Sequence, residues 1–306
     1  GLAGWNGCDA SLDVTRTILA VQKEVRRRVL SLDLRKLAKA KRKATEDDLL
    51  TVLWAGSFSG LLSTALRRTV QRVLHQLAIS LERPVIPQQK PTGPGAKILQ
   101  DLEDRLVIFK PAGWEVCDGN LNRQLQDVLH GWPTLQSPDH DYGFLHRVDV
   151  PCSGLILFAK TFPAFYDLQV QLRAGEIHRD YVVLCHGWLH DRTIEAQIDM
   201  RGDGPTWTGR IGKPSRSFIK LVAQVSGFAA ASLIAVRIAT GRRYQIRSHA
   251  AFVAHPVVRD EKFTAFGTQE CDFKFCERCF LHRYSLVFKD RHGESHEVTD
   301  GLPTDL

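Results

Sequence analysis

The sequence lacks any long uninterrupted apolar run. None of its apolar stretches approaches the roughly 18 residues that a helix needs to span a bilayer, so we expect no transmembrane helix and no membrane partner. It also lacks internal repeats and low-complexity segments, which excludes a solenoid built from repeated units. The remaining composition, 43% hydrophobic and 25% charged over 306 residues, is typical of a globular protein with a large core.

The sequence also lacks a regular cysteine pattern. Its seven cysteines are an odd number at irregular spacing, which argues against a disulfide framework. We therefore expect reduced thiols and an intracellular, reducing compartment, with cytoplasm, nucleus and organelle all left open. The chain begins at Gly1 instead of a methionine, so we expect a piece of a longer protein, and any targeting segment would lie outside it.

Positive charge is concentrated in one part of the chain. Residues 1–97 hold 17 Lys and Arg against 8 Asp and Glu, whereas the other residues hold 24 against 26. The net charge of +7 therefore comes entirely from the first third. Such asymmetry is typical of attraction to a polyanion such as nucleic acid, although a solvated helical surface explains it equally well.

The N-terminal third has a helical pattern. Apolar residues recur at helical spacing in 12–30, 33–44 and 61–81, which predicts amphipathic helices. In 46–55 three acidic residues precede an apolar run, and acids favour the first turn of a helix. We therefore predict a basic helical region over residues 1–83.

A linker separates this region from a different kind of sequence. Residues 84–96, PVIPQQKPTGPGA, contain four prolines and two glycines, which predicts a linker over 84–97. Beyond it, short β-rich runs alternate with helical candidates at 122–130 and 163–172. This mixture predicts an α+β fold with a mixed sheet in a separate domain over 98–306. The predicted strands are 105–109, 154–159, 181–185, 218–225, 231–238 and 284–288.

Three polar segments stand next to apolar runs. Asp149 lies in HRVDVPCSGLILFAK (146–160), directly before a turn and an apolar strand. Tyr181 opens the β-rich run YVVLC, and TGRRYQIRSH (240–249) places three arginines within six residues. Each feature alone has an ordinary explanation: a turn aspartate, a core tyrosine and solvated arginines.

Together these segments resemble the RluA/RsuA class of pseudouridine synthases. The class motif His-Arg-Leu-Asp is matched by 146–149, its basic-x-Tyr motif by 179–181, and its Thr-Gly-Arg-x-His-Gln-Ile-Arg-x-His motif by 240–249. The resemblance covers about 101–290 in the right order and spacing, and it does not extend to residues 1–97. Further matching segments are DLEDRLVIFKPAGWEV, AHPVVRD and LHRYSL.

The resemblance implies a fold and an activity. The expected fold is the pseudouridine synthase fold, with a mixed, largely antiparallel central sheet flanked by helices and loops. The expected activity is the isomerisation of specific uridines to pseudouridine in RNA, with ribosomal or transfer RNA ahead of messenger RNA as substrate. We expect a monomer that uses no cofactor and no metal.

The resemblance assigns the chemistry to three residues. Asp149 is the expected catalytic carboxylate, acting either as a nucleophile or by removing the 2′ proton of the ribose. Burial favours the neutral acid and an arginine favours the ionised form, and Arg247 is the expected arginine, 98 residues away in the chain. Tyr181 is expected to stack on the uracil and to take part in proton transfer.

Other residues are expected to hold the substrate. Arg147 is expected to fill the space left by a flipped-out uridine or to bind a phosphate, and Leu281 to pack against the base. His146, Arg242 and Gln245 complete the expected substrate-binding set. The sequence departs from the class pattern at Val148, Cys152, Tyr244 and Arg259; none of these removes a catalytic group, but Arg259 replaces a glycine in a loop expected to meet RNA.

Other interpretations stay open. Cys271, Cys276, Cys279 and His282 have a spacing that suggests zinc, but we expect His282 to lie on a strand, where alternating residues would not converge on one metal. The same scaffold would also serve a catalytically inactive RNA-binding protein or RNA chaperone, which the basic N-terminal helices favour and the three catalytic candidates oppose. A third possibility is a helical adaptor that recruits a partner through residues 1–97.

Overall fold

The computed structural model describes residues 12–82, 95–117, 121, 123–200, 205–226 and 230–306. Most of the predicted linker, 84–94, lies outside the described residues. Among the helices that are described, none combines the length and apolar character required to cross a membrane.

The N-terminal region is helical. It consists of α1 (Leu12–Leu30), α2 (Lys39–Phe58) and α3 (Thr64–Leu81), with a short 3-10 turn, Leu34–Lys36, between the first two. Ser63 caps α3 by accepting a hydrogen bond from Leu66 N (3.1 Å), as serine commonly does at this position. The prediction that acidic residues near 46 begin a helix was wrong. Residue Glu46 lies in the middle of α2, where its carboxylate is buried and accepts a hydrogen bond from Tyr166.

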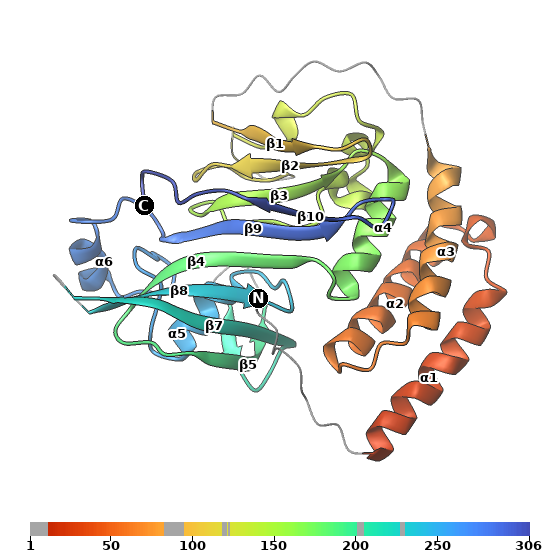
Figure 1. The fold of residues 1–306 in the computed structure, drawn as a ribbon, viewed down its shortest axis with the longest axis horizontal. Coiled ribbons are helices and arrows are strands. Elements are labelled where there is room, and N and C mark those ends of the chain that lie inside the picture. The colour runs from red at the N-terminus through yellow and green to blue at the C-terminus, as the bar shows by residue number, and fades with distance from the viewer. Residues whose placement is uncertain (1–11, 83–94, 118–120, 122, 201–204, 227–229) are drawn as a thin grey trace.

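A single twisted sheet forms the centre of the remaining chain (Figure 1). Its strand order is β1-β2-β3-β9-β4-β8-β7-β5-β6, and β10 also pairs with β9. All pairs are antiparallel except β3 with β9, which confirms the predicted α+β class with a mixed, largely antiparallel sheet. The strands are β1 (Lys97–Asp101), β2 (Arg105–Lys110), β3 (Ser153–Ala159), β4 (His178–His186), β5 (Arg192–Asp199), β6 (Trp207–Gly209), β7 (Lys213–Val225), β8 (Ala231–Ile238), β9 (Leu281–Lys289) and β10 (Ser295–Thr299).

Three helices accompany the sheet: α4 (Phe162–Arg173), α5 (Gln245–Phe252) and α6 (Phe266–Asp272). The helix predicted over 122–130 is wrong among the described residues, because only the 3-10 turn Gln126–Val128 forms there. The backbone of Arg123 and Leu125 instead exchanges hydrogen bonds with Glu115, so the segment is used as an extended partner of another loop. Two more 3-10 segments, Pro133–Gln136 and Pro138–Gly143, lead toward β3.

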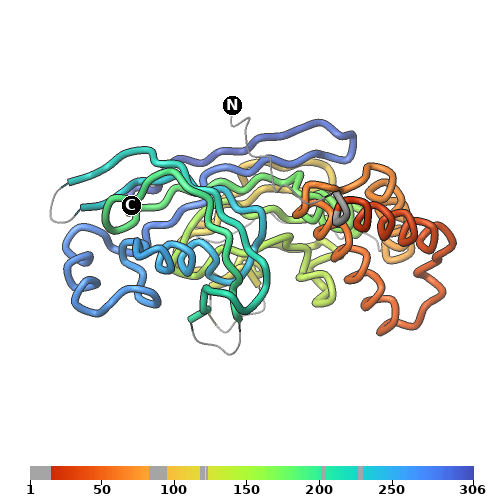
Figure 2. The backbone as a smooth tube through the Cα atoms, turned by 90° about the horizontal axis from the view of Figure 1, so that it is seen from below, coloured from red at the N-terminus to blue at the C-terminus, as the bar shows by residue number. Residues whose placement is uncertain are grey.

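Side chains of the central strands pack on both faces of the sheet. Leu155 and Leu157 of β3 belong to a core shared with α1–α4, and Ile156 and Phe158 to the core on the opposite face. Alternation of side chains along a strand has this effect when both faces are covered. The N-terminal helices therefore pack through α4 onto one end of the sheet, as Figures 1 and 2 show.

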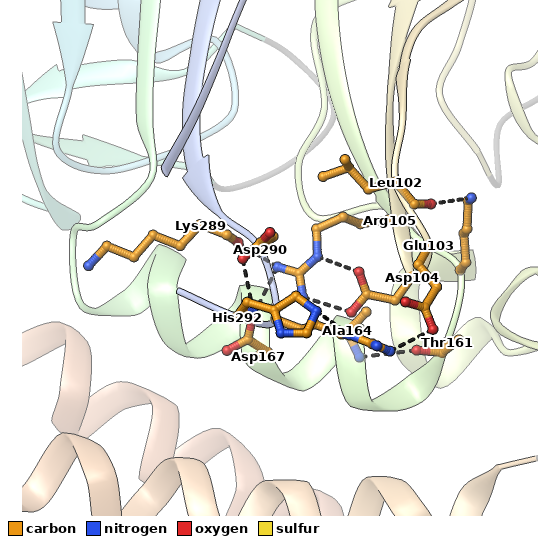
Figure 3. Close-up of polar contacts among 12 residues, drawn as sticks. Leu102, Glu103, Asp104, Arg105, Thr161, Ala164, Asp167, Lys289, Asp290 and His292 are labelled. Carbon is orange, nitrogen blue, oxygen red and sulfur yellow. Dashed lines mark hydrogen bonds and ion pairs between the residues drawn. The ribbon is translucent and has the colours of Figure 1, made fainter. Parts of the chain in front are cut away.

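A buried arginine joins this end of the sheet to the helices (Figure 3). Arg105 is fully buried, and its guanidinium binds Asp104 (2.8 Å), Asp167 of α4 (3.0 Å) and the carbonyl of Lys289 (2.6 Å). Asp167 also accepts a hydrogen bond from Gln71 of α3 (3.1 Å). Pairing and hydrogen bonding are what make a buried charge tolerable, so this cluster fixes β2, β9, α3 and α4 relative to one another.

Candidate active site

A cavity of about 1460 Å³ lies at one side of the sheet. Its wall is made by the loop before β3, by β4, by the loop between β8 and α5, and by the start of β9. Helices α2, α4 and α5 and several loops, among them 115–117, 259–262 and 277–279, contribute further side chains. Arginine is the most frequent residue in this wall, and an arginine-lined cavity is suited to a polyanionic ligand. The lining arginines are Arg147, Arg173, Arg179, Arg242, Arg243, Arg247, Arg259, Arg278 and Arg283.

The loop that carries Asp149 is held through its backbone. Cys152 N donates to the carbonyl of Asp149 (3.0 Å), and Gly113 N donates to the carbonyl of Val150 (2.7 Å). On the other side, Arg283 Nη2 donates to the carbonyl of Arg147 (3.0 Å). These three bonds restrict the loop, which keeps the Asp149 carboxylate in one place.

Lys110 also binds the loop that carries Asp149, through hydrogen bonds from its side chain. This buried lysine at the end of β2 donates from Nζ to the carbonyls of Cys152 (2.8 Å), Trp114 (2.9 Å) and Pro111 (2.9 Å). Burial lowers the pKa of Lys110 to about 7, because an apolar surrounding disfavours the charged amine. The lysine sits in the matched segment DLEDRLVIFKPAGWEV, but its contact with the Asp149 loop was not foreseen.

Asp149 and Arg247 are brought together as the resemblance implied. Arg247 Nη1 donates to Asp149 Oδ2 at 3.0 Å, and the Asp149 side chain keeps 26% of its surface exposed to the cavity. The other edge of the Arg247 guanidinium binds Asp260 twice, at 2.8 and 2.6 Å. Although burial acts in the opposite direction, the hydrogen bonds and charge of Asp260 raise the pKa of Arg247 above its ordinary value. The arginine is therefore charged and fixed in orientation.

Asp260 is a site residue that sequence reasoning missed. Its side chain is fully buried and accepts hydrogen bonds from both Arg247 and Lys262 N (3.0 Å). Asp260 is the last residue of the matched segment AHPVVRD. The match therefore pointed to this residue, but the sequence analysis assigned it no role. A buried carboxylate that binds a buried arginine in a fork is a positioning group.

Tyr181 lies on β4 next to Arg283, a site arginine that the sequence analysis did not assign. The tyrosine is 4% exposed and lines the cavity, and its hydroxyl accepts a hydrogen bond from Arg283 Nη2. The Arg283 guanidinium also lies 4.9 Å from the Tyr181 ring centroid and donates to His146 Nδ1 (2.6 Å). Burial, together with the charge of Arg283, holds the pKa of His146 well below its ordinary value, so the imidazole is a neutral acceptor.

The remaining predicted residues differ in how free their side chains are. Arg147 is exposed and Leu281 is buried, and both line the cavity. Gln245 is also buried there, but its amide is engaged by Thr240 (2.6 Å) and Ser217 (3.0 Å). Arg242 lies over the Trp54 ring at 5.2 Å. Gln245 thus anchors the loop that carries Arg242, and direct contact of these four residues with a substrate stays a prediction.

Two departures from the class pattern, Arg259 and Tyr244, have left-handed backbone. Arg259 has a φ of 62°, at a position where the class pattern has glycine, the residue that adopts this conformation without strain. Arg259 nevertheless lines the cavity, with its guanidinium 3.3 Å from the Phe273 ring centroid. Tyr244 also has positive φ (57°) and receives Arg247 at 4.9 Å from its ring.

The cysteine-rich segment does not form a cluster of ligands among the described residues. There, His282 is fully buried on β9 and bonds Ser153 (3.0 Å), and Cys276 donates to a carbonyl. The one group with ligand atoms close enough for a metal within the described ranges is Asp290, Glu294 and His296, in the β9–β10 hairpin. Hydrogen bonds within the hairpin already engage Asp290.

Comparison with known proteins identifies similar sequences. Residues 104–252 match the family model of RNA pseudouridylate synthase. The chain is 31% identical over 203 residues to ribosomal large subunit pseudouridine synthase C of Salmonella typhi, covering 62% of this chain and 61% of that protein. It is 34% identical over 173 residues to ribosomal large subunit pseudouridine synthase D of Nitrosomonas europaea, covering 54% and 48%. The chain thus spans about three fifths or less of the length of these two curated relatives.

Solved structures share the fold. Human RNA pseudouridylate synthase domain containing 1 superposes with a TM-score of 0.55 at 20% identity, covering 71% of this chain and 86% of that chain. Human RNA pseudouridylate synthase domain containing 4 gives a TM-score of 0.53 at 17% identity, covering 76% and 93%. At such identities the likeness establishes the architecture alone.

Proposed function

Since residues 104–252 belong to the RNA pseudouridylate synthase family, we propose that this protein isomerises uridine to pseudouridine in RNA. The observation that supports it best is the Asp149 carboxylate, which faces an arginine-lined cavity and is held by Arg247. A protein that only binds RNA has no use for a carboxylate presented toward phosphates. The proposal therefore favours an enzyme over an inactive RNA-binding protein or chaperone.

The reaction requires few groups. The N1–C1′ bond of uridine breaks, the uracil turns, and C5 forms a bond to C1′; the proton on C5 is lost and N1 gains one. Asp149 acts on the nucleoside, either by covalent attack on the sugar or base or by removal of the 2′ proton. Tyr181 stacks on the uracil so that the detached base stays in the cavity, and Arg283 holds the tyrosine through its hydroxyl.

The target base must leave its stack to reach Asp149. Extrusion of a nucleotide costs a few kcal/mol, which contacts with the protein must offset. We assign this role to Arg147, which is supported by its exposed side chain in the cavity wall, two residues before Asp149 in the sequence, and by the bond from Arg283 to its carbonyl. Ribosomal RNA is the substrate that we propose first, because the relatives are named for the large ribosomal subunit.

The test is Asp149→Asn, which keeps the shape of the side chain and removes its charge. We expect pseudouridine formation to fall by at least about 10³-fold, with RNA affinity and thermal stability nearly unchanged. Product is measured by chemical labelling of pseudouridine and affinity by filter retention. Asp48→Asn, an exposed carboxylate on α2, is the matched control. Turnover of Asp149→Asn within about tenfold of the parent would exclude Asp149 as the essential carboxylate.

A further inference from the structure

Helix α2 contributes an aromatic residue to the cavity wall. Trp54 lines the cavity, although it lies outside both the family match at 104–252 and the segment that resembles the class motifs. Its ring is half-buried and packs on Phe58, with centroids 5.2 Å apart. Residues of the catalytic domain hold the pair: Arg242 lies 5.2 Å from the Trp54 ring and Arg216 lies 4.4 Å from the Phe58 ring.

Two arginines with incompletely satisfied guanidinium groups lie in the cavity wall near this tryptophan. Arg173, in the last turn of α4, lines the same cavity as Arg242. Within the described part of the chain, the Nε atoms of both arginines are buried without a hydrogen-bond partner. Burial lowers the pKa of both guanidinium groups; the charge of Arg173 lowers that of Arg242 further, and Asp47 and Asp141 act on Arg173 in the opposite direction. A bound anion would stabilise the charged forms of these two neighbouring arginines.

We propose that Trp54, Arg242 and Arg173 form a subsite for the nucleotide next to the target uridine. The base stacks on the Arg242 guanidinium, which itself lies over the Trp54 ring, and the phosphate pairs with Arg173. Nucleic-acid bases stack on aromatic rings and on guanidinium planes, and arginine binds phosphate in a fork. The subsite rests on the proposed function, and it assigns the N-terminal helices a direct part in substrate binding.

The competing explanation is that Trp54 only attaches α2 to the sheet. The two explanations differ in what they require of the side chain. Attachment requires apolar volume, which leucine largely supplies, whereas stacking requires an aromatic plane, which phenylalanine supplies and leucine does not. Trp54→Phe and Trp54→Leu therefore separate a stacking role from a packing role.

Binding is measured on the full chain with fluorescein-labelled oligouridine of about twelve nucleotides, a length within the range of single-stranded sites. We expect Trp54→Leu to weaken the affinity by about tenfold and Trp54→Phe to stay within about threefold of the parent. Arg173→Gln should lower the slope of log affinity against log salt by about 0.7, the change for one lost contact to a single strand. Trp188→Leu and Arg291→Gln, exposed residues outside the cavity wall, are the matched controls.

Parental affinity of Trp54→Leu would overturn the proposal. Equal losses for the Leu and Phe variants, accompanied by a lower melting temperature, would overturn it in favour of a packing role. The result is separable from the proposed activity because binding is measured without turnover. Weaker binding by Trp54→Leu together with no pseudouridine from the parent protein would support the subsite and refute the activity.

Discussion

At the scale of single residues, the arrangement of Arg247 is the most informative feature. Its guanidinium has five N–H donors, and Asp260 engages Nε and one Nη2 hydrogen in a fork. This leaves Nη1 directed at Asp149. Lysine has the same charge but not the planar fork, so the two carboxylates require arginine and not merely a cation.

The order of activity among Arg247 variants follows from this geometry. We expect Arg247→Lys to form pseudouridine about 10²-fold more slowly than the parent, and Arg247→Met to be slower still. Methionine leaves the two carboxylates, Asp149 and Asp260, without this cation. Single-turnover rates of pseudouridine formation measure this order. The Met variant should also lose about 3 kcal/mol of unfolding free energy. Parental activity of the Met variant would show that Arg247 is only a phosphate contact, and the partner of Asp149 would have to be sought at Arg147 or Arg243.

At the scale of elements, the contact of β3 with β9 positions the loop that carries Asp149. This is the one parallel pair among the described strands, and it joins Ser153 and Gly154 to His282 and Arg283. Gly154 has φ 131°, and a Cβ there would lie 2.4 Å from the carbonyl oxygen of Arg283. Glycine is therefore required where the chain leaves the Asp149 loop, since backbone atoms cannot give way as a flexible side chain can.

Gly154→Ala should consequently separate β3 from the start of β9. We expect a loss of about 2–4 kcal/mol of unfolding free energy, from the strained φ and the backbone clash together. Activity should fall as well, because Arg283 holds both Tyr181 and the Asp149 loop. Gly209→Ala, where an added Cβ meets nothing within 4 Å, is the control for urea unfolding curves. A stability equal to that of the control would contradict the expectation.

At the scale of the whole molecule, buried histidines link stability to pH. Burial lowers the pKa of His140 and of His249 to about 4, and it lowers those of His178 and His282 as well. Between about pH 4 and 6.5 the unfolded chain therefore binds more protons than the folded one, so the free energy of unfolding falls as the pH falls through this range. Glu46, whose pKa burial raises, acts in the opposite direction.

We expect His140 and His249 each to cost on the order of 1 kcal/mol of stability by pH 5. Urea unfolding at a series of pH values measures the slope. His249→Asn cannot titrate and should have a flatter profile than the parent, while Asp48→Asn should keep the parental slope. A parent whose stability does not change between pH 6.5 and 5 would contradict the argument.

The basic N-terminal helices act at the same scale. Lys23, Arg26 and Lys41 are exposed on α1 and α2, and the net charge of the chain originates in this third. Replacing all three by glutamine should weaken RNA binding and reduce the slope of log affinity against log salt by up to about 2–3, because fewer phosphates are neutralised. Fluorescence anisotropy with oligouridine measures both effects. An unchanged slope would instead support a protein-docking role for these helices.

The amino-acid sequence by itself determined the class of chemistry and the main elements. Motif residues around Asp149, Tyr181 and Arg247 lie within short segments, and the helices and central strands follow from periodicity that depends on near neighbours. Local patterns gave the wrong prediction at 122–130, where the backbone pairs with another loop, and strands β1, β5, β6 and β10 were not predicted.

Only the tertiary structure decided which side chains meet. Arg247 and Asp149 are 98 residues apart, and Arg283 and Tyr181 are 102 apart, so their contacts depend on the strand order and not on spacing. The contact of Asp260 with Arg247 and the position of Trp54 in the cavity wall also depend on how distant segments pack. The physical reason is that a local pattern specifies which face of an element is buried, whereas the partner on that face is set by how distant elements pack.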